Sequence, residues 1–174
     1  VYNKAWITHN NFKPMTEARA LALLTKLAPV MDPELMIFAY AEGKPAGLLL
    51  CLPELNTIYK KIGKGHLNFF NKLRFLWLLK RGGTRKVFGF VLGVIPEYQK
   101  KGVESIMVMH LAKATQVEKP KYDLFDFAWV GDFNPGMVSL VESFGVNRIK
   151  TDTTFRKLFD ESKTFQRSPI IHHK

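Results

Sequence analysis

The sequence contains a single cysteine, and this scarcity excludes an internal disulfide framework. Cys51 lies in the apolar stretch "AGLLLCLP", so we expect a buried free thiol and a reducing compartment, which favours a cytoplasmic location. The first residues also lack the charged, apolar and small-residue succession of a secretory signal peptide. The chain begins with Val1 instead of Met, which leaves open that it is a fragment of a longer protein.

Acidic residues are scarce, and residues 60–86 contain none while carrying nine lysines and arginines. The net charge is +11, with a pI near 9.8. Such a balance favours polyanionic partners: phosphorylated cofactors, nucleic acid or an anionic membrane. A solvated basic face ranks above any of them. No aromatic and basic single-strand platform or recognition-helix pattern is visible, so we expect no specific nucleic-acid binding.

The length of 174 residues fits one domain, and a composition with 47% hydrophobic and 24% charged residues indicates a folded chain. No internal repeat is visible along the sequence. We expect a single domain over residues 1–161 and a loose tail over 162–174. The two adjacent histidines of that tail, His172 and His173, give no reason to expect a metal site.

Periodicity and turn residues predict alternating helices and strands. A helix beginning at Thr16–Glu17 ends at Pro29, and an antiparallel hairpin turns at Glu42–Gly43–Lys44. A helical insertion at about 54–85 follows, and then a third strand over 85–96, in which Gly89 and Gly93 suggest a bulge or a close backbone approach. The next predicted elements are a helix over 102–117, a strand over 124–131, a helix opened by Asn134, and one or two closing strands within 147–160. The residues expected to face inward on the 102–117 helix are Val103, Ile106, Met107, His110, Leu111 and Ala114.

The insertion contains a strongly apolar helix, "LNFFNKLRFLWLLK", too short to span a bilayer. Its main stripe is Phe69, Phe70, Leu73, Leu76 and Trp77. Three interpretations are ranked: core or lid over an acceptor groove, then a subunit or second-domain interface, then a helix lying on an anionic membrane. The membrane ranks last because an interfacial helix needs a strongly polar face, and this helix is largely apolar.

The stretch "GVIPEYQKKGVESIMV" joins the third strand to the next helix. The first N–H groups of a helix lack internal partners and carry the positive end of its dipole. Gly102 allows a close backbone approach, and Lys100 and Lys101 add positive charge. These features suit a pyrophosphate, although most strand-to-helix turns bind nothing.

Here the chain resembles the GCN5-related N-acetyltransferases, whose loop reads Gln or Arg, two residues, Gly, one residue, then Gly or Ala. Val94-Ile95-Pro96 followed by Gln99-Lys100-Lys101-Gly102-Val103-Glu104 carries the resemblance. The stretch "NPGMVSLVESFG" is similar to the last helix of that family. The resemblance covers roughly residues 35–160 and implies an α/β fold with a mixed, mostly antiparallel twisted sheet flanked by helices.

The resemblance also implies acetyl-CoA or another acyl-CoA as co-substrate and an amine as acceptor. Backbone groups of Gly93 and Val94 would pair with the pantetheine arm, and Asn134 would approach it from the opposite side. The pyrophosphate would be held by the N–H groups of Gln99, Lys100, Lys101, Gly102, Val103 and Glu104. A base would remove the amine proton, and an acid would protonate the leaving thiolate.

Two positions depart from the family pattern. Glu104 stands where Gly or Ala is preferred, and its charge would repel a pyrophosphate while favouring the helix start. Val141 stands where the family commonly has the tyrosine acid, and the nearby Phe155 and Phe159 cannot donate a proton. The alternative function is therefore a GNAT-like domain without catalysis that serves as a structural or binding half of a larger protein.

The catalytic residues stay unassigned at this point. Asp126, Glu54 and His66 are the candidates for a base, and each has a structural explanation at least as good. Asp126 would be a capped or paired carboxylate, Glu54 a solvated carboxylate and His66 a residue at a helix start. Asn134 is a helix cap on any interpretation.

Overall fold

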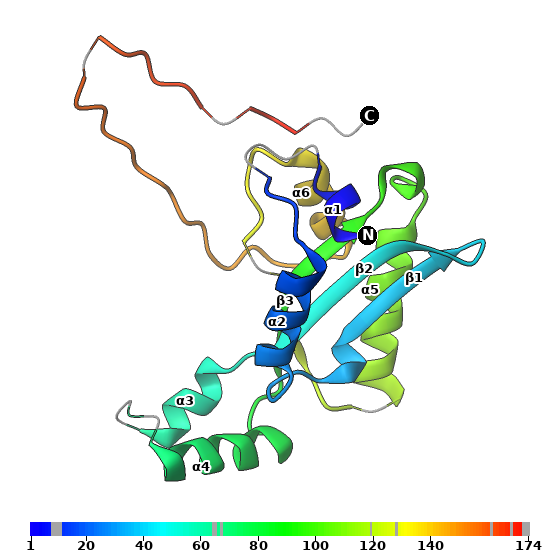
Figure 1. Ribbon diagram of the computed structural model, residues 1–174, viewed down its shortest axis with the longest axis vertical. Coiled ribbons are helices and arrows are strands. Elements are labelled where there is room, and N and C mark those ends of the chain that lie inside the picture. The colour runs from blue at the N-terminus through cyan, green and yellow to red at the C-terminus, as the bar shows by residue number, and fades with distance from the viewer. Residues whose placement is uncertain are drawn as a thin grey trace. The chain divides into compact units, whose positions relative to one another are not determined.

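The computed structural model describes residues 1–7, 12–63, 66, 68–118, 120–127, 129–160, 162–167 and 169–171 (Figure 1). His172 and His173 lie outside the described residues. The chain forms two compact units, Val1–Ala128 and Trp129–Lys174. The single domain over residues 1–161 stays a prediction.

The first unit is built on a four-stranded sheet in the order β1 (Met36–Ala41), β2 (Lys44–Pro53), β3 (Lys86–Val94) and β4 (Leu124–Phe127). β1, β2 and β3 pair antiparallel, and β4 is parallel to β3. The predicted hairpin is confirmed: Glu42 and Gly43 both have positive φ, 51° and 73°, which matches the tight turn that suits twisted strands. The predicted mixed, mostly antiparallel α/β sheet is likewise confirmed.

One face of the sheet is covered by α5 (Val103–Ala112), which continues as a π-helical segment over Lys113–Glu118. Met107 and Leu111 are spaced i, i+4 and are 1% and 2% exposed. Cys51 is buried in the same core, as predicted. The expected inward positions of Ile106 and His110 are wrong. Both are exposed, because the contact seam follows Met107 and Leu111 and turns the residue before each toward solvent.

The short helix α1 (Tyr2–Ala5) packs against β3. Trp6 follows it and lies so close to Gly93 that a Cβ there would be 2.2 Å from the indole ring. The predicted close approach at Gly93 is therefore real, and an aromatic ring of the same chain makes it. The helix α2 (Glu17–Leu27) begins as predicted, with Thr16 accepting a hydrogen bond from the Arg19 N–H.

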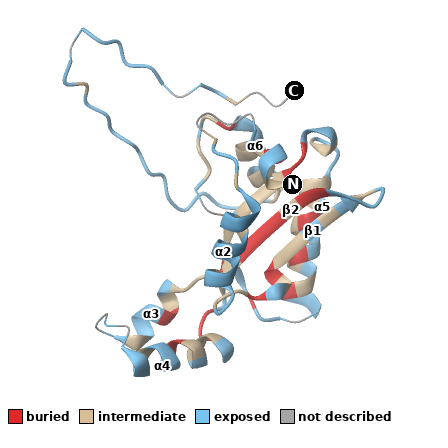
Figure 2. Cartoon of the chain, viewed as in Figure 1, coloured by how far each residue is buried: buried red, intermediate tan, exposed pale blue. Residues whose placement is uncertain are grey.

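Between β2 and β3 the chain forms α3 (Asn56–Ile62) and α4 (Phe69–Lys80), so the predicted helical insertion is confirmed. Figure 2 shows α4 largely exposed. The first-ranked interpretation of its stripe is core or lid over an acceptor groove. The core interpretation is wrong for most of the stripe, because Phe69, Phe70, Leu73 and Trp77 are all more than half exposed, and the lid stays a prediction. None of the helices that the structure describes is long and apolar enough to cross a bilayer.

The second unit contains α6 (Pro135–Ser143), opened by Asn134 as predicted. The closing strands expected within 147–160 are wrong: these residues, all described, have no strand structure. Their alternating residues suit a sheet, but no partner strand is paired with them, and Phe155 and Phe159 are 90% and 95% exposed.

Candidate functional site

The parallel strands β3 and β4 share only part of their length. The paired residues run from Lys86–Leu124 to Gly89–Phe127, and the structure describes no further pair between the two strands, although β3 continues to Val94. We call residues 90–94 on this side the open edge of β3. A β-bulge in β3, opposite the Leu50–Cys51 step of β2, marks the start of the open edge, as predicted from Gly89. Unpaired strand backbone is a template for another extended chain or a ligand arm.

The open edge leads directly into the loop predicted to hold an anion. Ile95 N–H donates to Ala46 O at 2.9 Å, and a 3₁₀ turn follows at Pro96–Tyr98. The Gln99 side chain then folds back, and its Nε2 donates to Val94 O at 2.8 Å. The N–H of Gln99 itself donates to Pro96 O. Gln99 therefore ties the loop to the end of β3.

The backbone after Gln99 enters the left-handed region twice. Lys100 has φ +59° and Gly102 has φ +79°, with Lys101 between them outside the left-handed region. Such alternation turns successive N–H groups towards one side and makes an anion-binding nest. A Cβ at Gly102 would have nothing within 4 Å, so the space beside it is open. The arrangement fits the phosphate cradle that the sequence predicted.

The first turn of α5 adds to this cradle. Gly102 is the N-cap residue, and no side chain caps the helix. The N–H groups of the first turn are thus left to an external acceptor, and the helix dipole favours an anion there. Lys101 adds positive charge, with its Nζ 5.3 Å from the centroid of the Tyr98 ring. Glu104 opposes this charge, because its half-buried carboxylate lies in the same first turn.

Asn134 belongs to the second unit. Its side chain accepts a hydrogen bond from Met137 N–H at 3.1 Å and is nearly buried, which is the geometry of a helix cap. Val141 lies in the helix that it opens. The approach of Asn134 to a pantetheine arm stays a prediction.

The three candidates for a base have different environments. Asp126 on β4 forms a half-buried ion pair with Lys86 on β3, with 2.8 Å between Oδ2 and Nζ. Glu54 accepts hydrogen bonds from the N–H groups of Asn56 and Thr57 and from the Thr57 hydroxyl, so it caps α3. Burial raises the pKa of Glu54, but these hydrogen bonds outweigh it and lower the pKa overall. His66 is exposed. Only Asp126 stands on a strand next to the open edge.

The only cysteine is unsuited to nucleophilic chemistry. Cys51 is 2% exposed, and burial raises the pKa of its thiol to about 12. A thiol protonated at neutral pH and closed to solvent is inert. The structure therefore gives no support to a covalent acyl-cysteine intermediate.

A buried polar cluster was missed by the sequence analysis. Asp32 is 7% exposed and accepts hydrogen bonds from Lys121 Nζ and from Tyr122 OH, the latter at 2.7 Å. Burial raises the pKa of Asp32, but the hydrogen bonds from Lys121, Tyr122 and the Glu34 N–H outweigh it and lower the pKa. The cluster ties the segment before β4 to the segment before β1. Ninety residues separate Asp32 from Tyr122, so no local pattern could reveal it.

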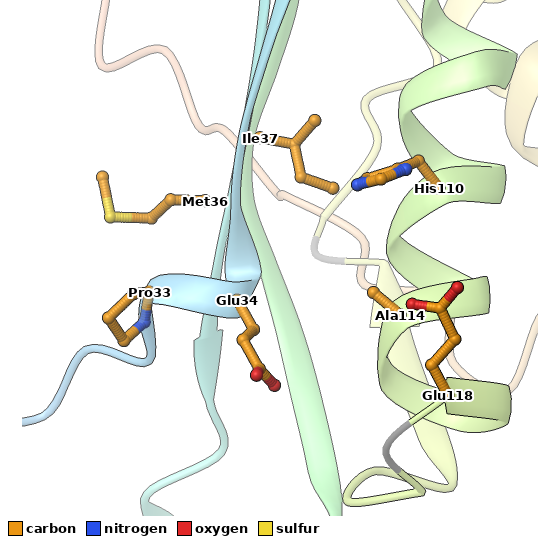
Figure 3. A pocket seen from close by; sticks show the side chains of 7 residues that line it. All are labelled: Pro33, Glu34, Met36, Ile37, His110, Ala114 and Glu118. Atoms are coloured by element: carbon orange, nitrogen blue, oxygen red, sulfur yellow. The ribbon is translucent and has the colours of Figure 1, made fainter.

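A pocket of about 320 Å³ lies between the start of β1 and the C-terminal half of α5 with its π-helical extension. Ile37 and His110 face each other across it (Figure 3). Glu34 and Glu118 also line it, and Glu118 pairs with Lys113 at 3.2 Å. The pocket lies at the other end of α5 from the phosphate cradle. Among the described residues, no group of three His, Cys, Asp or Glu could hold a metal ion.

Solved structures with the same architecture decide the fold. AAC(6')-Iy in complex with the bisubstrate analogue CoA-S-monomethyl-acetylneamine matches at a TM-score of 0.55 and 13% identity, over 91% of this chain and 87% of that chain. The aminoglycoside 6'-N-acetyltransferase AAC(6')-Ig from Acinetobacter haemolyticus matches at 0.52 and 15%, over 91% and 93%. The chain has the fold of the GCN5-related N-acetyltransferases. The low identities show a divergent example of this acetyltransferase fold.

Two curated proteins are similar in sequence, and no family model matches. The bacterial ceramide synthase of Caulobacter vibrioides (strain NA1000 / CB15N) is 28% identical over 159 residues, which are 90% of this chain and 41% of that protein. Protein YghO of Escherichia coli (strain K12) is 24% identical over 159 residues, 90% of this chain and 40% of that protein. The chain thus spans about two fifths of the length of these curated relatives.

Proposed function

We propose that the chain is an N-acyltransferase domain that takes an acyl group from acyl-CoA and transfers it to an amine. The observation that carries this proposal is continuity. Along the chain, the open edge of β3 is followed by the 3₁₀ turn at Pro96–Tyr98, then by the nest at Lys100–Gly102 and the uncapped N-terminus of α5. A ligand with an extended polar arm and an anionic group needs an open strand edge beside an anion-binding helix start. CoA has both parts, in its pantetheine arm and its pyrophosphate.

The residues present fit such a ligand. In this proposal Gly93 and the N–H of Val94 at the open edge bind the pantetheine arm, while Val94 O stays bound to Gln99 Nε2. The N–H groups of residues 100–104 bind the pyrophosphate. Gln99 would hold the loop in place and would not bind the ligand itself, because its side chain and its N–H already donate hydrogen bonds within the loop. Acyl-CoA would supply an activated thioester. Asp126 is the carboxylate best placed to receive the amine proton, since it lies on β4 next to the open edge.

The relatives guide the choice of acceptor. A ceramide synthase forms the amide of a long-chain amino alcohol, so a chain similar to one fits a long-chain amine as acceptor. Apolar surface on the sheet is consistent with such a substrate. Phe38 and Tyr40 on β1 and Phe90 on β3 are about half exposed or more. The complete activity would belong to a longer protein of which this chain is one part.

Calorimetric titration with acetyl-CoA and with a medium-chain acyl-CoA tests the binding step. We expect heat and a thermal shift with at least one of them, and weaker binding by Lys101→Glu. The matched control is Lys44→Glu, which makes the same charge change at the exposed β1–β2 turn. Absence of binding up to millimolar acyl-CoA, or equal loss of affinity in both variants, would refute the proposal. Release of free CoA thiol in the presence of a long-chain amine then measures transfer.

The second candidate is a domain that binds CoA or another part of the protein but does not catalyse transfer. Val141 in place of the tyrosine acid and the ion pair between Asp126 and Lys86 favour it. Binding of acyl-CoA without thiol release in the complete protein would support this alternative. Where thiol release is seen, Asp126→Asn tests the assignment of the base: it should lower the rate of release and leave the affinity for acyl-CoA nearly unchanged.

A further inference from the structure

The insertion between β2 and β3 presents an exposed apolar face. On α4 the side chains of Phe69, Phe70, Leu73 and Trp77 are 69%, 78%, 51% and 53% exposed. Their spacing of i, i+1, i+4 and i+8 places them on one side of the helix. Soluble proteins rarely leave aromatic and leucine side chains of this size together in water, so a contiguous patch of this kind marks an interaction surface.

The opposite side of α4 is packed within the insertion. Phe75 is 6% exposed, and its ring lies 4.9 Å from that of Tyr59 on α3. Ile58 of α3 is fully buried. The helix therefore has apolar side chains on two opposite sides for two separate reasons: one side packs on α3, and the other side is presented outward. This removes the objection that an interfacial helix must have a polar face of its own, because the helical hairpin is the unit that docks.

Positive charge borders the exposed face. Lys72 and Arg74 lie on its two flanks by helical spacing, and Lys80 and Arg81 end the helix. Arg81 stacks on Trp77, with 4.7 Å between its guanidinium carbon and the ring centroid. Lys72, Arg74 and Lys80 form no ion pair with another described residue. No aspartate or glutamate occurs between Glu54 and Glu97, so no acid of this segment offsets these charges.

We propose that the α3–α4 hairpin docks on the surface of an anionic lipid bilayer, with Phe69, Phe70, Leu73 and Trp77 inserted at the headgroup boundary. Aromatic and leucine side chains flanked by lysine and arginine are the composition that binds this interface. Aromatic side chains are enriched at protein interfaces as well, so the feature that favours the bilayer is the border of lysines and arginines, which an anionic lipid surface would attract. A second copy of the chain fits least, because a symmetric contact would bring two unpaired basic sets together.

Vesicle co-sedimentation measures the charge dependence. We expect the chain to partition onto vesicles of phosphatidylcholine with phosphatidylglycerol and to bind phosphatidylcholine alone far more weakly. The variant with Lys72, Arg74 and Lys80 all changed to Glu should lose about a hundredfold or more in partition coefficient, because each lost cation contributes about fivefold and each added carboxylate is repelled by the anionic surface.

The control for charge changes three other exposed cations of the same unit, Arg19, Lys26 and Lys44, to Glu. This control has the same net charge as the test variant. An equal loss of partition coefficient in both variants would show that net charge alone attracts the chain to the vesicles, and would overturn the proposal. Equal binding to neutral and anionic vesicles would overturn it as well.

The apolar contact is tested separately. Phe70→Ser with Leu73→Ser should weaken binding by roughly tenfold or more, because both side chains leave the interface. Ile106→Ser with Met109→Ser on α5 is the matched control, since those side chains are 65% and 68% exposed. Circular dichroism checks that all variants are folded.

The depth of Trp77 gives a readout that a purely structural role would not produce. Vesicles with brominated lipid should quench part of the tryptophan emission, and Trp77→Phe should abolish that quenching although Trp6 and Trp129 remain. Quenching that persists in Trp77→Phe would overturn the proposal. The proposal would also be overturned if the chain binds no vesicles and forms a dimer that Phe70→Ser dissociates, because the exposed face would then join two copies of the chain.

Discussion

Replacing Glu104 with glutamine reports on the charge balance at the phosphate cradle. Glu104 lies in the first turn of α5, whose N–H groups have no side-chain cap. An anion bound by the same turn would lie about 6 Å from the carboxylate. Glutamine keeps the size and the hydrogen-bonding oxygen and removes only the charge. We therefore expect tighter acyl-CoA binding and a slightly less stable free protein.

The magnitudes follow from the position of the side chain. Two unit charges about 6 Å apart repel by about 0.7 kcal/mol at a dielectric constant of ~80 and by about 3 kcal/mol at ~20. Glu104 is half-buried, so an intermediate value of about 1.4 kcal/mol applies, which is about a tenfold decrease in Kd. Loss of the favourable charge–dipole interaction should lower the free energy of unfolding by about 0.3–1 kcal/mol.

The assay is calorimetric titration of acyl-CoA with thermal unfolding of the free protein. Glu97→Gln is the matched control, because Glu97 is exposed in the 3₁₀ turn before the loop and outside the first turn of α5. It should change Kd by less than about twofold, since its charge is more screened. A Kd for Glu104→Gln that rises, or that changes no more than that of Glu97→Gln, would refute the repulsion argument. Glu104→Gly should also tighten binding, at a larger loss of stability.

Three further predictions concern the supports of the site. Gln99→Ala should weaken acyl-CoA binding and lower the free energy of unfolding by about 1 kcal/mol, because the carbonyl of Val94 loses its donor; unchanged thermal unfolding would contradict this. Gly93→Ala should displace the ring of Trp6, which lies 2.2 Å from the added Cβ, at a cost of about 1–3 kcal/mol, seen as a red shift of tryptophan emission. The pKa of Asp32 is lower in the folded state than in the unfolded state, so its contribution is present above the unfolded pKa and is lost as the pH falls through the folded value. Asp32→Asn should therefore cost about 2 kcal/mol at neutral pH and flatten the acid side of the stability profile measured by urea unfolding; an equally steep acid side in the variant would count against this assignment.

Local signals in the sequence were enough for most of the sheet. Glu42–Gly43 predicted the hairpin because a tight turn needs positive φ at adjacent residues. Gly102 with two lysines predicted an open, positively charged helix start for the same local reason. The family resemblance carried the element order, and the solved acetyltransferases confirm the fold.

Features that depend on distant partners could not be read in this way. The stripe on α4 has the composition of a core helix, and only the packing of Phe75 on α3 shows which side is satisfied. The residues around Phe155 have strand-like composition, yet a strand forms only where a neighbour supplies hydrogen bonds. Asp32 and Tyr122 meet through the tertiary fold alone. The roles of residues 93–104 towards CoA stay predictions until binding is measured.

The burial of Cys51 makes the native chain silent towards thiol reagents. With the thiol 2% exposed and its pKa raised to about 12, maleimides and nitroxide reagents have no reactive target in the folded protein. A cysteine introduced at an exposed position such as Phe70 would thus carry a spin label alone, with no background substitution needed. The accessibility of that label to oxygen and to a water-soluble relaxant would then follow the outward face of the helical hairpin directly.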